Sequence, residues 1–164
     1  DQEPGEHALH RGRQRTGEGL YTLARRASEG TSRLADNPRL RFGLVLSNPP
    51  YVPAATSTLP RHRRARCWDA GPDGRALLDR ICAGVPDVLT DDGTVLIVHS
   101  AVCDTAGTLA ALRRAGLAAR ELARIAVQFG PVMHSRASLL EAGGFVARGQ
   151  RHEELVVVEG RRDG

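Results

Sequence analysis

An apolar run that leads directly into Asn48-Pro49-Pro50-Tyr51 constrains this chain more than any other feature. The run reads Phe-Gly-Leu-Val-Leu over 42–46 and is β-compatible, whereas two consecutive prolines cannot continue a hydrogen-bonded ladder. We therefore predict a buried strand that ends at Asn48. In open α/β sheets, ligands bind beyond the carboxyl ends of the strands. A carboxamide, two rigid rings and an aromatic ring are thus expected beside a ligand.

The chemistry of this tetrapeptide favours binding of a planar amino or amide group. The side-chain oxygen of Asn48 and the backbone carbonyl of Pro49 are acceptors, so together they can hold both hydrogens of an NH₂ group. Tyr51 can cover the flat face of that group. Because no strong base is present, we expect catalysis by orientation of the nitrogen toward an electrophile. We predict Asn48, Pro49 and Tyr51 as catalytic residues, and the same residues with Pro50 as substrate-binding; the alternative is a simple strand-ending turn.

The remaining pattern predicts an α/β fold. Apolar spacing indicates a helix over 77–89 that Pro86 interrupts, with Asp73 as its cap. Further strands are expected at 94–98, 121–127 and 155–158, further helices at 105–115 and 135–142, and a turn at 91–93. Strands that alternate with helices indicate βαβ units and a mainly parallel sheet. Residues 1–40 are weakly patterned, and 41–160 carry the strong pattern.

Composition limits the class of protein. With 164 residues and 41% hydrophobic content, the chain can bury a real core. No apolar run approaches the roughly 20 residues that span a bilayer, and the first 20 residues show no signal-peptide pattern. The three cysteines are odd in number and widely spaced, which predicts free thiols in a reducing cytoplasm. The histidines show no metal-binding spacing, and the net charge of +4 is too mild to imply nucleic acid by itself.

Several further motifs accompany the tetrapeptide, and together they resemble a known family. They read Ser-Asn-Pro-Pro-Tyr-Val-Pro at 47–53, Ala-Gly-Pro-Asp-Gly-Arg at 70–75, Leu-Leu-Asp-Arg at 77–80, Asp-Gly-Thr-Val-Leu-Ile-Val-His-Ser at 92–100, Phe-Gly-Pro-Val at 129–132 and Gln-Arg-His-Glu-Glu-Leu-Val-Val-Val at 150–158. From 42 to about 159 the chain resembles class I S-adenosylmethionine-dependent methyltransferases of the HemK type. Members of that family methylate glutamine side chains, typically in the Gly-Gly-Gln motif of translation release factors.

This resemblance implies a Rossmann-like fold with an antiparallel last strand, S-adenosylmethionine as the methyl donor and a release factor as the protein partner. It assigns Asn48 and Pro49 to holding the glutamine amide, with Tyr51 packed beside it. The family's first strand and glycine-rich cofactor loop are missing here, since only 47 residues precede Asn48. Asp1 resembles the acidic residue that binds the cofactor ribose, so we expect Asp1 and Asn48 to be cofactor-binding. Residues 1–40 are then a remnant of the cofactor-binding half, and 41–160 are the catalytic half.

Two alternatives remain open at this stage. The same tetrapeptide serves adenine-N6 methylation of DNA or RNA, and the basic run with Arg61, Arg63, Arg64 and Arg66 would contact RNA phosphates in that case. Its other interpretation is a solvated loop. The second alternative is a non-catalytic fragment that keeps the shell of the fold and acts as a binding module, which the missing cofactor loop favours.

Overall fold

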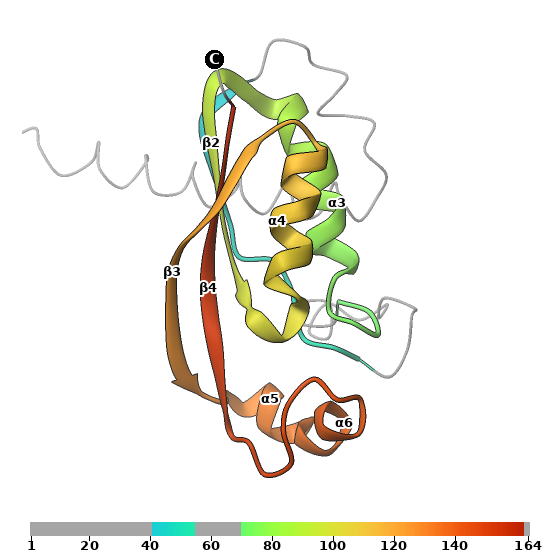
Figure 1. Cartoon of the computed structure of the whole chain (residues 1–164). Helices are drawn as coiled ribbons and strands as arrows, with labels where there is room; N and C mark the ends of the chain where they lie inside the picture. The colour runs from blue at the N-terminus through green and yellow to red at the C-terminus, as the bar shows by residue number, and fades with distance from the viewer. Residues whose placement is uncertain (1–40, 55–69, 163–164) are drawn as a thin grey trace, which may run out of the picture.

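The computed structural model of the chain describes residues 41–54 and 70–162. Within these ranges a mixed sheet of four strands has the order β1-β2-β4-β3 (Figure 1). The strands are β1 (Phe42–Ser47), β2 (Leu89–Ser100), β3 (Ala118–Gln128) and β4 (His152–Arg161). The helical elements are α3 (Ala76–Gly84), the 3₁₀ turns η2 (Val85–Val88) and η3 (Ala101–Cys103), α4 (Thr105–Arg114), α5 (Pro131–Ser135) and α6 (Ala137–Ala142).

The strand directions place three carboxyl ends at one edge of the sheet. β1 pairs with β2 in parallel, and β4 is antiparallel to both β2 and β3. The last strand is therefore antiparallel, as expected, and β1, β2 and β3 run in one direction. The prediction of a mainly parallel sheet is wrong for the pairings, because β4 lies between β2 and β3 and only β1 and β2 pair in parallel. Their carboxyl ends meet at the lower end of Figure 1, where α5 and α6 lie. The segment 1–40, to which the sequence assigned the remnant of a cofactor-binding half, lies outside the described residues.

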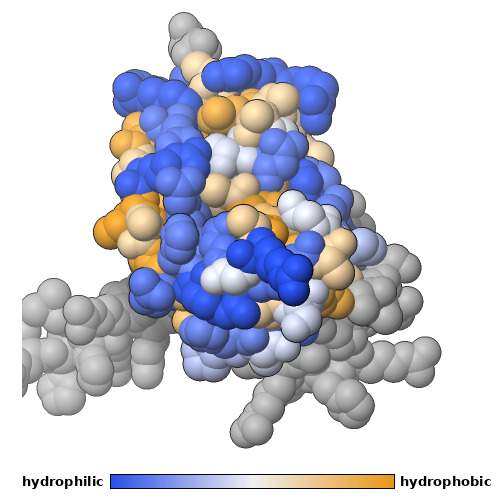
Figure 2. Space-filling model, turned by 60° about the horizontal axis from the view of Figure 1, so that its bottom comes forward, coloured by the Kyte–Doolittle hydropathy of each residue, from blue (hydrophilic) through white to orange (hydrophobic). Residues whose placement is uncertain are grey.

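One face of the sheet carries the main core, because α3 and α4 pack against it (Figure 1). Leu78 of α3 and Leu112 of α4 are completely buried against Ile97 of β2. The opposite face leaves large apolar side chains exposed; these are Phe42, Leu44 and Leu46 of β1 and Ile125 of β3. Figure 2 shows apolar surface along its left margin, on the side away from α3 and α4.

Local structure departs from the sequence expectation in three places. The predicted helix over 77–89 ends as α3 at Gly84 and continues as the η2 turn, since Pro86 has no N–H for an α-helical bond. Residues 91–93, predicted as a turn, lie inside β2 as a bulge. Phe42 of β1 pairs with Leu89 of β2, and Leu44 pairs with Thr94, so five residues of β2 are passed for two of β1. The predicted helix 135–142 begins two residues later, as α6, and a further helix that the sequence did not predict, α5, precedes it.

Replacing Leu78 with alanine should lower the free energy of unfolding by about 2–5 kcal/mol, because a fully buried side chain is lost and a cavity remains. The matched control is Leu46→Ala on the uncovered face, where the side chain is 45% exposed and the loss should stay below about 1 kcal/mol. Urea denaturation measures both. Equal losses would show that the two faces of the sheet are equally covered.

Candidate functional site

A cavity of about 250 Å³ lies beyond the carboxyl end of β1. One side is formed by the consecutive residues 48–52 and the other by residues 130–133 with Glu153. Asn48, Pro49, Pro50 and Tyr51 thus all line one pocket. Their roles as substrate-binding and catalytic residues stay predictions. The Asn48 side chain is exposed and accepts no hydrogen bond from the described residues, so its carboxamide is free for a ligand. Asp1 and the arginines of 61–66 lie outside the described residues.

The segment that follows the tetrapeptide is held from two sides. Residues Val52 and Ala54 form a short backbone pairing with the 70–71 segment: Ala54 N–H donates to the Gly71 carbonyl at 2.9 Å, and Ala70 N–H donates to the Val52 carbonyl at 3.2 Å. From the other side, Arg136 Nη1 donates to the Pro53 carbonyl at 3.1 Å. Backbone order at this pocket therefore comes from tertiary contacts, not from the sheet ladder alone.

The backbone carbonyl of Tyr51 is held by contacts from residues distant in the sequence. The Cys103 thiol donates to it at 2.7 Å, and burial raises the pKa of that thiol to about 12, so the thiol keeps its proton near neutral pH. Gly74, with φ of +74°, lies beside this hydrogen bond, and a Cβ atom there would overlap both the same oxygen and the Cys103 sulfur. A residue with a side chain at position 74 would push the motif out of place.

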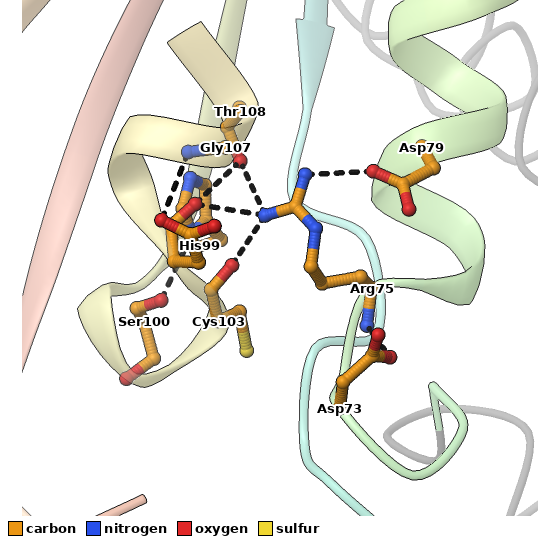
Figure 3. A network of polar contacts seen from close by, with 9 residues as sticks. Asp73, Arg75, Asp79, His99, Ser100, Cys103, Gly107 and Thr108 are labelled. Carbon is orange, nitrogen blue, oxygen red and sulfur yellow. Dashed lines mark hydrogen bonds and ion pairs between the residues drawn. The ribbon is translucent and has the colours of Figure 1, made fainter. Parts of the chain in front are cut away.

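Arg75 joins the elements that lie behind the motif, as Figure 3 shows. Its guanidinium donates to the carbonyl oxygens of Cys103 and Asp104 and to the Thr108 hydroxyl, and it pairs with Asp79 at 2.7 Å. The start of α3 is thereby attached to the η3 turn and to the start of α4. No role for Arg75 was predicted from the sequence. One signal in the sequence could have indicated such a role. An arginine at the start of a helix is disfavoured by the helix dipole, so its guanidinium is expected to bind acceptors elsewhere.

Asp73 was predicted to cap α3, but it does not. The N-cap position is Arg75, which makes no side-chain capping bond. The Asp73 carboxylate instead accepts a hydrogen bond from Arg75 N–H at 2.9 Å and closes the turn before the helix. The predicted helix cap is therefore wrong, because Asp73 lies two residues before the N-cap position.

The far wall of the pocket is built by the Phe-Gly-Pro-Val motif. Phe129 N–H donates to the Arg151 carbonyl at 2.9 Å, which fixes the end of β3. Pro131 then begins α5, where its missing N–H costs no helical bond. The Phe129 ring meets His134 edge to face, with the ring centres 5.8 Å apart. Pro131, Val132 and Met133 give this wall an apolar surface.

Glu153 is the polar group on that wall, and the sequence analysis did not single it out. It is only 5% exposed, and its Oε2 atom has no hydrogen-bond partner. Burial raises its pKa, and the Ser100 hydroxyl opposes part of that rise. Burial and the nearby Glu153 charge also raise the pKa of Tyr51 to about 12. A detectable signal was that Glu153 alternates with Leu155 and Val157 on one strand face, where a carboxylate is unusual.

His99, at the end of β2, is a core residue. Its side chain is fully buried, Nδ1 lies 2.8 Å from the Ser100 carbonyl, and burial lowers its pKa. It does not line the pocket. Cys82 and Cys103 are buried and free, as predicted, whereas Cys67 lies outside the described ranges. Within 41–54 and 70–162 no group of ligating side chains could hold a metal ion, and no helix there is long and apolar enough to cross a membrane.

The chain is similar in sequence to a curated protein whose name states an activity. Over 102 residues, 62% of this chain, the sequence is 31% identical to the Methanocaldococcus jannaschii protein named "Putative protein N5-glutamine methyltransferase MJ0928". The chain is thus distantly homologous to a protein of the class that the motifs resemble. It spans about half of that relative's length, 52%.

A second comparison concerns solved structures. A chain of the E. cuniculi Mtq2-Trm112 complex, which methylates the translation termination factor eRF1, aligns with 73% of this chain and 51% of its own length. Its sequence identity is 19% and its TM-score is 0.43. No family model matches the chain.

Replacing Gly74 with alanine should destabilise the fold more than replacing Gly149, although both have a positive φ. A left-handed alanine costs about 1–2 kcal/mol at either position. At Gly149 nothing lies within 4 Å of the new methyl group, whereas at Gly74 it would overlap the Tyr51 carbonyl. We expect a further loss of about 1–3 kcal/mol for Gly74→Ala. Urea denaturation of both variants measures the difference, and equal losses would mean that position 74 does not support the motif.

The raised pKa of Glu153 should appear as a pH dependence of stability. Its pKa exceeds the ordinary value of 4.5 in the folded chain, so its contribution to stability is complete below pH 4.5 and is lost as pH rises through the folded pKa. The neighbouring Tyr51 and Cys103 have pKa values of about 12 and do not titrate in that range. The unfolding free energy of wild type minus that of Glu153→Gln should therefore fall as pH rises. A flat or rising difference would contradict the burial of this carboxyl group.

Proposed function

We propose that this chain is the acceptor-binding part of a class I methyltransferase domain that transfers a methyl group from S-adenosylmethionine to a protein glutamine side-chain amide. The observation that carries the proposal is the free Asn48 carboxamide, which lines a 250 Å³ cavity together with the rigidly anchored residues 49–52. The distant homology to a protein named as a protein N5-glutamine methyltransferase supports it independently. A release factor with a Gly-Gly-Gln motif is the expected protein substrate.

The residues of the pocket match the needs of an amide acceptor. Asn48 Oδ1 and the Pro49 carbonyl accept one hydrogen bond each from the two N–H groups of the carboxamide. Tyr51, which lines the same pocket, covers the plane of the group. The amide nitrogen is a weak nucleophile, so holding it in one orientation is the main contribution that these residues make. The apolar wall of Val132 and Met133 limits water around it.

The second requirement of the proposed reaction is a set of residues that bind the methyl donor. When bound, S-adenosylmethionine supplies an electrophilic methyl group on a positively charged sulfur. Asn48 is the proposed contact to both donor and acceptor, because its carboxamide is exposed, lines the cavity and has no partner among the described residues. The proposed second contact, Asp1, lies outside the described ranges. The residues described here therefore support acceptor binding, and the further contacts to the donor stay a prediction.

Asn48→Ala should reduce methylation of a Gly-Gly-Gln peptide by roughly 100- to 1,000-fold, because one aligned acceptor is lost from the site. The unfolding free energy should change by less than about 0.5 kcal/mol, since the Asn48 side chain is exposed. Initial rates of methyl transfer and urea denaturation measure the two effects. An unchanged rate would remove Asn48 from the mechanism.

Calorimetry with S-adenosylmethionine separates an enzyme from a non-catalytic binding module. Binding tighter than about 1 mM supports the proposed function. No measurable binding by this chain would favour the binding module. A full-length relative, titrated in parallel, is the positive control.

A further inference from the structure

Glu153 has the features of a binding group that lacks its ligand. It lies near the start of β4, its side chain is 5% exposed, and it lines the same cavity as Asn48. Its Oε2 atom is buried without a partner. A buried polar atom without a hydrogen bond is costly and uncommon in folded proteins, and a ligand that supplies the bond is one explanation for it.

The surroundings of Glu153 favour its neutral form. Burial raises its pKa, and no positively charged side chain in the described part of the chain offsets that rise. The titratable groups beside it are Tyr51, on the motif, and Cys103, on η3, and both are neutral below about pH 11. Ser100, on β2, contributes a hydroxyl and no charge. In its neutral form this carboxyl group has one O–H that it can donate.

The acceptor offers a matching group. A carboxamide has two N–H donors and one carbonyl oxygen. In the proposed function, Asn48 and Pro49 take the two donors, which leaves the carbonyl oxygen without a partner inside an otherwise apolar pocket. A buried carboxylic acid that stays neutral and donates a hydrogen bond is a known catalytic-site device.

We propose that Glu153 is a second recognition group of the acceptor pocket, whose protonated Oε2 donates a hydrogen bond to the carbonyl oxygen of the acceptor carboxamide. This inference rests on the proposed function. It makes the pocket complementary to a whole carboxamide, with two acceptors on the motif and one donor on the opposite wall. Glu153 is a positioning residue for the acceptor and takes no part in bond making.

Binding of an acetylated Gly-Gly-Gln peptide amide, followed by NMR titration between pH 5 and 9, tests the inference. The variants are Glu153→Gln, which keeps a donor but cannot ionise, and Glu153→Met, which has none. The matched control is Glu154→Gln, the adjacent carboxylate, which is exposed and paired with Arg124. The melting temperature of each variant is recorded beside its affinity.

The expected results are specific to a donor role. Wild-type affinity should fall as pH rises and Glu153 ionises, because a carboxylate repels the carbonyl oxygen. Glu153→Gln should bind within about threefold of wild type at pH 5 and lose the pH dependence. Glu153→Met should bind roughly tenfold or more weakly, since a hydrogen bond is lost, yet melt at a higher temperature, since an unpaired polar group is removed. Glu154→Gln should behave as wild type.

Each contrary result has a distinct meaning. Wild-type affinity from Glu153→Met, or an unchanged pH dependence in Glu153→Gln, would overturn the role of Glu153 and leave the proposed function intact. If Glu153→Met fails to fold, the pH dependence of Glu153→Gln decides the question alone. Absence of peptide binding by the wild-type chain up to millimolar concentration would instead overturn the proposed function, and this inference with it.

Discussion

The position of one backbone carbonyl, that of Tyr51, governs the geometry of the whole pocket. Two prolines prevent the chain from continuing in the sheet after Ser47, so no ladder bond holds residues 49 and 50. The Cys103 thiol and the close approach of Gly74 replace that support. Both partners are themselves fixed by Arg75, which follows Gly74 and donates to the Cys103 carbonyl. The carboxamide of Asn48 is thus exposed but stands on a rigid backbone.

This arrangement divides the pocket into two kinds of wall. The motif presents acceptors, namely the Asn48 carboxamide and backbone carbonyls, from a segment at the end of a parallel strand. The opposite wall comes from the start of α5 and from β4, and it is apolar apart from Glu153. Because the walls come from segments about 80 to 100 residues apart in the sequence, the site depends on the antiparallel insertion of β4 between β2 and β3.

The parts of this structure that the sequence predicted are those with local causes. Asn48 to Tyr51 could be placed at a strand end because proline stops a ladder within one or two residues. The strand of β4 and the helix α4 follow from periodicity. Periodicity could not assign the roles of Arg75, Cys103 and Glu153, because these roles arise from contacts between distant residues. Arg75 bonds to Cys103 across 28 residues of sequence, and Cys103 bonds to Tyr51 across 52. The division of residues 131–142 into two helices also depends on tertiary contacts, among them the bond from Arg136 to Pro53.

The central claim is that residues 48–52 and the wall that faces them form one pocket for a side-chain carboxamide. Amide chemical shifts of the ¹⁵N-labelled chain, recorded while a Gly-Gly-Gln peptide is added, test it most directly, with a Gly-Gly-Glu peptide as the comparison. We predict shifts at Asn48, Tyr51, Val132 and Glu153 with the glutamine peptide and much smaller ones with the glutamate peptide. Equal shifts with both peptides, or shifts confined to the uncovered face at Leu44 and Ile125, would contradict the account.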